Sequence, residues 1–197
     1  MRAGTLLATV LLLCACDAGS ITGDDDGPGD DDGAGTIDAA IFVDAPSADE
    51  PAGLEGTTAA HNAVRAAHGV GPLTWDPALA AIAQGWAEQC VDNEAPTGLI
   101  DHNANRSDTY PEYVGENVYG SGGTPRGTDA VELWVSEESD YDYPSNTCSG
   151  ICGHYTQVVW AATTKVGCGI HTCPGLAFGG TVVCNYAPGG NDGGRPY

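Results

Sequence analysis

The 197-residue sequence predicts an α+β domain that is crosslinked by disulfide bonds. Helical apolar patterns come first in the folded region, and segments rich in β-branched and aromatic residues come last. This order, helices and then strands, is typical of α+β proteins. The 8 cysteines are many for a chain of this length, and they indicate an oxidising compartment.

Three helices are predicted together with their ends. The first covers Thr58 to His68 and stops at Gly69. The second begins at the cap residue Asp76, which is followed by Pro77 in the first turn. The third runs from Thr128, its expected cap, to Glu138. On the second helix, apolar residues recur every three or four positions and predict a core-facing side: Leu79, Ile82, Ala83, Trp86 and Cys90.

A β-hairpin is predicted near the carboxyl end. Its strands are Lys165 to Thr172 and Phe178 to Tyr186, both rich in β-branched and aromatic residues. Between them, Cys173-Pro174-Gly175 has the composition of a turn.

The amino terminus has the pattern of an export signal. Arg2 precedes an apolar run from Leu6 to Leu13, which is too short to span a bilayer comfortably. Leu13-Cys14-Ala15-Cys16 resembles a bacterial lipobox, with Cys16 as the lipidated residue. The alternative is ordinary signal cleavage near Ala15 or Ala18. We therefore expect a signal over residues 1–16 and export to the cell envelope or surface by a lipid anchor, or secretion.

An acidic linker is expected over residues 17–55. The formal net charge of the chain is −21, and this segment holds twelve of the 27 carboxylates and no Lys or Arg. Its acidic run, Gly23 to Gly35, has almost nothing apolar to bury and fits an extended spacer. Calcium binding is a weaker alternative, because the closing Glu of a calcium loop is missing.

The acidic balance of the whole chain excludes nucleic acid as a partner. The folded domain is expected over residues 56–197, as a monomer.

Six cysteines remain for the folded domain once Cys14 is removed and Cys16 carries lipid. An even number suits a disulfide framework, but sequence alone allows fifteen pairings. The CxxxC pair at Cys148 and Cys152 favours a tight disulfide over a metal site. The six are Cys90, Cys148, Cys152, Cys168, Cys173 and Cys184.

Candidate chemistry centres on histidine and glutamate. The chain has no HExxH, GxSxG, Walker or GxGxxG motif. His102 and His154 lie in irregular, crosslinked regions that can hold a side chain rigidly, and neutral imidazole ligates zinc or copper. Glu116 and Glu137 are the carboxylates that are not obviously explained as solvent-exposed surface groups. The other histidines are expected to be structural, with His61 and His68 at the surface or half-buried on the first helix and His171 in the hairpin.

Several motifs occur in an order that resembles the CAP superfamily: cysteine-rich secretory, antigen-five and plant pathogenesis-related group-one proteins. The plant branch is the most similar. The resemblance covers about Thr57 to Tyr197. Its most specific motifs are GHYTQVVW, which begins at Gly153, and CNYAPGGN, which begins at Cys184. The others are His61-Asn62, Gly71 to Asp76, Leu79-Ala80, Gly115-Glu116-Asn117, Leu133 to Val135, Tyr141 to Tyr143 and Val166 to Cys168.

The resemblance implies a three-layer α-β-α sandwich with a central antiparallel sheet, and a cleft with two His and two Glu. Matched residue by residue, these are His102, Glu116, Glu137 and His154. Glu138 is adjacent to Glu137 and could compete with it, and His102 follows a longer loop than is common in the family. Within this set His102 and His154 are the candidate ligands of zinc or another divalent metal.

The resemblance also implies the disulfide pairing. Cys90 would pair with Cys173, Cys148 with Cys152, and Cys168 with Cys184.

Three functions are consistent with these patterns. The first is a binding module for a sterol or fatty acid, and the second is an extracellular module that binds another protein. The alternative is a metal-dependent hydrolase, such as a protease, that uses the cleft. Ser136 and Ser139 lie near the cleft without a recognisable triad. A groove could be lined by aromatic residues, which could equally be core: Tyr110, Tyr113, Trp134, Tyr141 and Tyr143.

Overall fold

A computed structural model describes residues 49–95 and 97–197, and these form an α+β domain as the sequence predicts. The expected signal, lipidation at Cys16 and the acidic run all lie outside the described residues. No helix within the described part is long and apolar enough to cross a membrane. The elements are α1 (Thr57–Ala67), β1 (Thr74–Trp75), α2 (Pro77–Ala87), β2 (Gly115–Ser121), α3 (Gly127–Ser136), a 3₁₀ turn (Glu137–Asp140), β3 (Tyr141–Asp142), β4 (Thr147–Cys148), α4 (Gly153–Val158), β5 (Lys165–Thr172) and β6 (Gly180–Ala187).

The central sheet has the strand order β1-β5-β6-β2. The three long strands β5, β6 and β2 are antiparallel, and β5 with β6 forms the predicted hairpin. The short edge strand β1 runs parallel to β5, so the sheet is mixed rather than wholly antiparallel. Strand β2 is the other edge of the sheet, and the functional groups described below lie along it.

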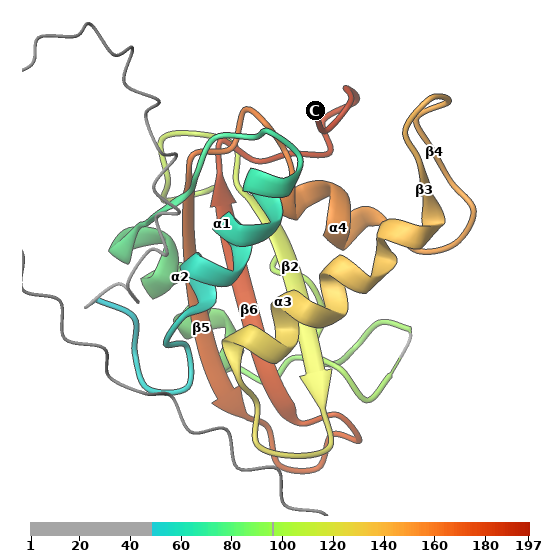
Figure 1. Ribbon diagram of the computed structural model, residues 1–197. Helices are drawn as coiled ribbons and strands as arrows, with labels where there is room; N and C mark the ends of the chain where they lie inside the picture. Colours follow the sequence, from blue (N-terminus) through green and yellow to red (C-terminus); the bar gives the residue numbers. More distant parts are fainter. Residues whose placement is uncertain (1–48, 96) are drawn as a thin grey trace, which may run out of the picture. The chain divides into compact units, whose positions relative to one another are not determined.

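Helices cover both faces of this sheet and make the expected three-layer sandwich (Figure 1). Side chains of β6 alternate between the two faces, as they must in a strand. Val182 and Tyr186 belong to the core under α1, α3 and α4, whereas Val183 packs with Ala83 and Ala87 of α2.

Two glycines of β5 let α2 lie very close to the sheet. A Cβ atom at Gly167 would lie 2.3 Å from the backbone nitrogen of Ala80, and one at Gly169 would lie 2.3 Å from that of Gln84. Both contacts are shorter than van der Waals distance, so a larger residue at either position would push the helix outward.

Helix ends follow local capping chemistry. The Asp76 side chain accepts hydrogen bonds from the backbone nitrogens of Ala78 and Leu79, so its prediction as a cap is confirmed. The prediction of Thr128 as a cap is wrong, because Arg126 holds the N-cap position of α3 and makes no side-chain cap bond. Thr128 instead lies inside the first turn.

The folded region begins ahead of the expected boundary at Gly56. The carboxylate of Glu50 accepts hydrogen bonds from the backbone nitrogens of Gly56 and Thr58, at 2.7 Å each. It therefore caps α1, whose own N-cap residue makes no side-chain bond. Leu54 is fully buried in the core.

All three disulfides that the resemblance implies are formed. Cys90–Cys173 joins the residues that follow α2 to the β5–β6 turn, across a sequence separation of 83. Cys168–Cys184 joins β5 to β6, and Cys148–Cys152 joins β4 to the start of α4.

His61 is fully buried, contrary to the expectation that it lies at the surface or is half-buried. Its ring nitrogens contact the Thr57 carbonyl and the Tyr186 hydroxyl, each at 2.8 Å. Burial lowers the pKa of His61 to about 4, the Thr57 carbonyl opposes this shift, and the nearby Arg65 cation adds to it. His61 is therefore neutral in the folded protein at neutral pH.

We expect the stability to fall as the pH drops from about 6.5 to about 4, because the unfolded chain then binds a proton that folded His61 excludes. The loss attributable to His61 is about 3 kcal/mol across this range. Urea unfolding at stepwise pH measures it. A His61→Gln variant should show a flatter pH dependence than the unsubstituted protein. Identical slopes in the two proteins would contradict this assignment.

Candidate functional site

Two histidine–glutamate pairs lie beside strand β2. His154 stands in the first turn of α4, and its Nδ1 lies 2.6 Å from Oε1 of Glu137, the first residue of the 3₁₀ turn after α3. The other oxygen of Glu137 accepts the backbone N–H of His154 at 3.0 Å. Trp134 stacks on the His154 ring, with ring centroids 6.3 Å apart. One carboxylate thus fixes both the ring and the main chain of His154.

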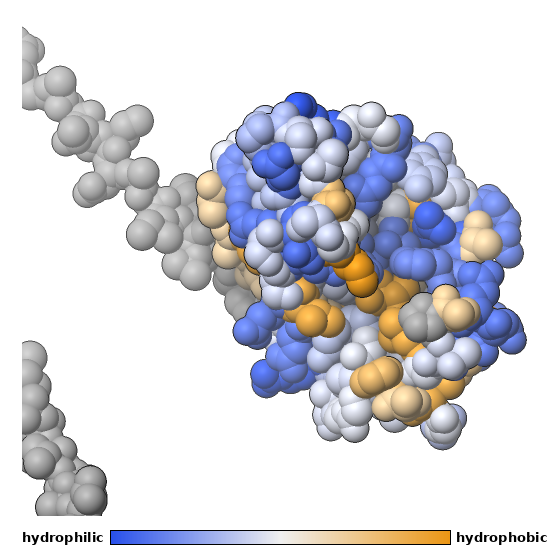
Figure 2. Space-filling model, turned by 90° about the vertical axis from the view of Figure 1, so that its right-hand side faces the viewer, coloured by the Kyte–Doolittle hydropathy of each residue, from blue (hydrophilic) through white to orange (hydrophobic). Residues whose placement is uncertain are grey.

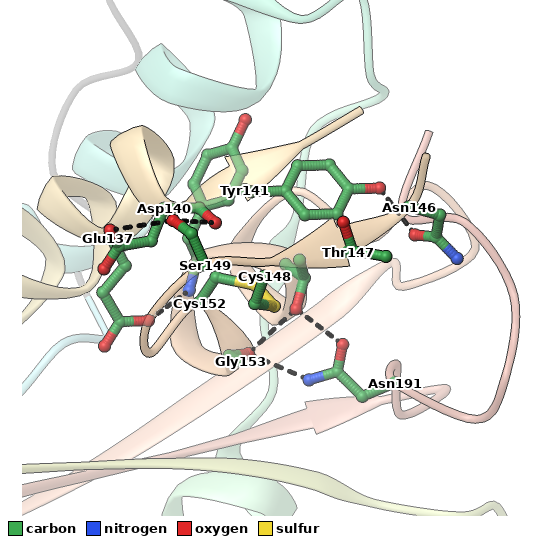
Figure 3. Close-up of a disulfide and its surroundings, with 12 residues drawn as sticks. Glu137, Asp140, Tyr141, Asn146, Thr147, Cys148, Ser149, Cys152, Gly153 and Asn191 are labelled. Carbon is green, nitrogen blue, oxygen red and sulfur yellow. Dashed lines mark hydrogen bonds between the residues drawn. A yellow bond between two sulfur atoms is a disulfide. The ribbon is translucent and has the colours of Figure 1, made fainter. Parts of the chain in front are cut away.

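The Cys148–Cys152 disulfide fixes the start of α4, just ahead of His154 (Figure 3). Cys152 is the N-cap residue of α4, so the crosslink holds the helix start against the β3–β4 hairpin. Asn191 bonds to the same turn, since its amide donates to the Gly153 carbonyl at 2.9 Å. The start of α4, and with it His154, is therefore held by a covalent bond and by the side chains of Glu137 and Asn191.

The second pair joins His102 to Glu116 of β2, with Nδ1 and Oε1 2.8 Å apart. The same oxygen accepts the backbone N–H of Asn103 at 2.8 Å. The side chain of Glu116 has no exposed surface, whereas that of His102 is 57% exposed. The second oxygen of Glu116 is buried and has no hydrogen-bond partner among residues 49–95 and 97–197. A buried, half-satisfied carboxylate of this kind needs a water molecule or a ligand group.

Strand β2 connects the two pairs. Glu116 belongs to one pair, and the side-chain amide of the next residue, Asn117, donates to the carbonyl of His154 at 3.0 Å. The structure thus brings His102 to Glu116 and His154 to Glu137, and β2 contacts both pairs through its adjacent residues Glu116 and Asn117. Glu138 does not compete for His154, because its carboxylate faces His68 at 3.3 Å.

These residues meet the requirements of a metal site only in part. In each pair a carboxylate binds Nδ1, which leaves Nε2 as the available ring nitrogen, an arrangement common for metal-ligating histidines. However, in residues 49–95 and 97–197 no three His, Cys, Asp or Glu side chains are grouped so that they could hold an ion. Catalytic zinc usually has three protein ligands, and His102 with His154 supplies two.

The two serines near the cleft are not arranged as nucleophiles. The Ser136 hydroxyl donates to the Leu133 carbonyl at 2.6 Å, and the Ser139 hydroxyl donates to the Ser136 carbonyl at 3.3 Å. Among the described residues, neither hydroxyl bonds to a histidine, so no Ser–His pair is formed.

An apolar groove of about 360 Å³ runs beside the His154–Glu137 pair. Leu99 and Phe178 line one side of it, and Leu133 and Trp134 line the other. Figure 2 shows hydrophobic residues gathered along a hollow on this face. Large apolar side chains at its rim remain strongly exposed, among them Leu133, Ile151 and Phe178. The complete lining is Leu99, Val118, Tyr119, Gly120, Leu133, Trp134, Ser136, Glu137, Ile151, His154 and Phe178.

Of the five aromatic residues that could line a groove or belong to the core, Trp134 lines this groove and the other four do not. Tyr110 bonds to Asp76 at 2.9 Å and packs near α2, and Tyr141 lines a smaller hollow near the carboxyl terminus. Tyr113 and Tyr143 are exposed elsewhere. Leu99 and Ile151 lie in loops without periodicity, and Phe178, predicted as the first residue of a strand, precedes β6, which begins at Gly180. Leu133 belongs to the third predicted helix, Thr128 to Glu138.

Comparison with known proteins identifies the family. Residues 58–186 match the family described as CAP, the cysteine-rich secretory protein family. The chain is 44% identical to pathogenesis-related protein 1 of Arabidopsis thaliana over 132 residues, 66% of this chain and 73% of that protein. It is 36% identical to GLIPR1-like protein 1 of Mus musculus over 160 residues, 77% of this chain and 66% of that protein.

Solved structures share the fold. Venom allergen-like protein 4 of Schistosoma mansoni matches with a TM-score of 0.58 and 28% identity, over 75% of this chain and 94% of that one. NaASP2, solved with Zn²⁺, matches with a TM-score of 0.56 and 22% identity, over 78% of this chain and 87% of that one. The family match, the pathogenesis-related relatives and the sandwich with its three disulfides agree: this chain belongs to the CAP family of cysteine-rich secretory proteins.

Proposed function

We propose that this CAP domain is an exported binding module that holds an apolar ligand in the groove along β2. The observation that carries this proposal is the groove itself, with apolar walls left open to solvent and a polar pair at one end. Monomeric soluble proteins rarely expose contiguous apolar patches without a use for them. Ligand sites are typically apolar clefts of about 300 to 1,000 Å³ with a few fixed polar groups.

The polar end of the groove sets the orientation of the ligand. His154 and Glu137 both line the groove, and their mutual bond fixes the ring so that its second nitrogen is free to bond a ligand. An apolar body would lie against Leu133 and Trp134, with its polar group at His154. A fatty acid or a sterol meets this requirement, as does a peptide.

Substitution of Leu133 should weaken binding without unfolding the domain. Its side chain is 51% exposed on α3, so Leu133→Asp places a charge in the groove at little cost to folding. We expect at least a tenfold rise in Kd for dansyl-undecanoic acid or a fluorescent cholesterol analogue, measured by fluorescence titration. Tyr113→Ser is the matched control, since Tyr113 is 52% exposed and lies outside the groove. Equal affinity in both variants would place the ligand elsewhere.

A second candidate is a weak divalent-metal site at His102 and His154. The carboxylate-bound Nδ1 atoms favour it, and the absence of a third grouped ligand among the described residues limits its affinity. Calorimetric zinc titration should show at most weak binding at pH 7.5, less at pH 5.5, and none in His102→Ala or His154→Ala. Zinc binding that survives both substitutions would show that the two histidine–glutamate pairs are not the metal site.

A hydrolase would need a reacting group that these residues do not assemble, so we place binding ahead of catalysis. If protease or esterase activity is nevertheless found, it should disappear in His154→Ala with folding retained.

We also propose that the domain acts as a monomer outside the cell, tethered by lipid at Cys16. Metabolic labelling with a palmitate analogue, compared with Cys16→Ser, tests the tether.

A further inference from the structure

The floor of the groove is the free edge of strand β2. Trp134 Nε1 donates to the carbonyl of Val118 at 3.2 Å. In an antiparallel strand the N–H and C=O of one residue point to the same side. The carbonyl of Val118 accepts a side chain of α3, which indicates that the backbone groups of Val118 point away from β6.

The register of the sheet leads to the same orientation independently. Asp76 N–H bonds to the Val166 carbonyl, so the backbone groups of Val166 face β1 and those of Gly167 face β6. Gly167 pairs with Asn185, which therefore faces β5, and its neighbour Cys184 faces β2. Cys184 pairs with Asn117, so Asn117 faces β6. The alternate residues of β2, Glu116, Val118 and Gly120, face outward.

Apart from the Val118 carbonyl, which Trp134 occupies, the outward backbone groups of Val118 and Gly120 lack a partner within the described part of the chain. Among the described residues, no hydrogen bond is made by the N–H of Val118 or by the N–H and C=O of Gly120. Val118 is buried and Gly120 is partly buried. Backbone groups removed from water without a partner are costly, so this edge is suited to a partner that supplies hydrogen bonds.

The walls of the groove stand on the two faces of this edge. Leu99 and Phe178 pack where a side chain of Gly120 would lie, with Leu99 Cδ1 2.4 Å from an added Cβ. Leu133 and Trp134 come from α3 on the opposite face. A ligand on this edge would therefore meet main-chain donors and acceptors in the middle and apolar surface on both sides.

We infer that the ligand of the groove is an extended peptide that adds to β2 as a further strand. This inference rests on the proposed function and names its ligand class. A strand pairs with the floor through its main chain and directs alternate side chains to the two walls. A lipid could use the walls but would leave the N–H groups of Val118 and Gly120 unpaired.

The charges near the groove indicate which residues the peptide carries at its two ends. Glu132 and Asp129 line the adjoining hollow on α3, Glu137 lines the groove, and no Lys or Arg does. Asp129 is paired with Arg126 and Glu137 with His154, which leaves Glu132 as the acidic group of these two linings that has no partner among the described residues. The preferred peptide is therefore apolar in its centre and carries lysine or arginine at its ends.

Calorimetric titration of the oxidised protein with acetyl-Lys-Lys-Val-Leu-Val-Leu-Lys-Lys-amide tests the inference. We expect binding, at least tenfold weaker when the four central residues are N-methylated, because methylation removes the donors and keeps the apolar surface and charge. Leu133→Asp should also weaken binding of the unmethylated peptide at least tenfold, and Tyr113→Ser should not.

The outcomes separate the two proposals. Equal affinity for the methylated and unmethylated peptides would overturn strand addition. Binding of dansyl-undecanoic acid that depends on Leu133, with no binding of either peptide, would also overturn it and would leave the proposed function intact. If neither the fatty-acid and sterol probes nor the peptides bind, both proposals fail.

Discussion

Replacing Arg65 with methionine is expected to lower the free energy of unfolding by about 3 to 5 kcal/mol. Arg65 is fully buried, and its guanidinium donates to the carbonyls of Gly71, Val158, Trp160 and Thr163 at 2.7 to 2.9 Å. Burial lowers the pKa of Arg65 to about 10, so it remains a cation at neutral pH. Methionine has a similar length but no donor, so all four carbonyls lose this partner, and the Trp160 carbonyl keeps only its bond from the Thr163 N–H at 3.1 Å.

Urea unfolding measures this change. Arg126→Met is the matched control, because the Arg126 side chain is 66% exposed and makes a surface pair with Asp129, so its loss should change stability little. Arg65→Lys should recover part of the loss, since a lysine can reach some of the carbonyls. If Arg65→Met were as stable as Arg126→Met, the carbonyl network would not be what joins α1 to the loop after α4.

Removing the Cys90–Cys173 disulfide has the next largest expected effect, a loss of about 3 to 5 kcal/mol. The crosslink closes a loop with a sequence separation of 83, so it restrains the unfolded chain strongly. It also fixes the residues after α2 to the β5–β6 turn. The double variant Cys90→Ala/Cys173→Ala, followed by thermal and urea unfolding, tests this.

The Cys148–Cys152 disulfide provides the contrast. Its sequence separation is 4, for which the same chain-entropy argument gives about 2 kcal/mol. We expect Cys148→Ala/Cys152→Ala to cost less stability than the Cys90 pair but to weaken ligand binding, because it frees the start of α4 beside His154. A larger stability loss in this variant would contradict the loop-length argument.

Much of the fold was predictable because its signals are local. Asp76 followed by Pro77 indicates a helix start, Gly69 a helix end, and Cys173-Pro174-Gly175 the turn of the hairpin. Strand β2 was not predicted, since its pattern, GENVYGS, depends on pairing with β6 far along the chain. The parallel pairing of β1 with β5 is likewise set by tertiary structure and has no sequence signal.

For the candidate site, too, local motifs were informative, whereas contacts between distant segments were not predictable. Sequence motifs pointed to His102, Glu116, Glu137 and His154, but the choice between Glu137 and Glu138 required the geometry of the 3₁₀ turn. The groove was not predictable, because Leu99 and Phe178 come from separate loops and meet only on the folded sheet edge. The burial of His61 depends on Tyr186, a contact that spans most of the domain.

The most direct test of the central claim, that the groove along β2 is the ligand site, is mapping of backbone and indole ¹⁵N–¹H shifts. The oxidised protein would be titrated in turn with dansyl-undecanoic acid and with the lysine-flanked peptide. We expect the largest changes at Val118, Gly120, Leu133 and the Trp134 indole. Changes confined to the opposite face, around α2, or to the hollow beside Tyr141 would contradict it.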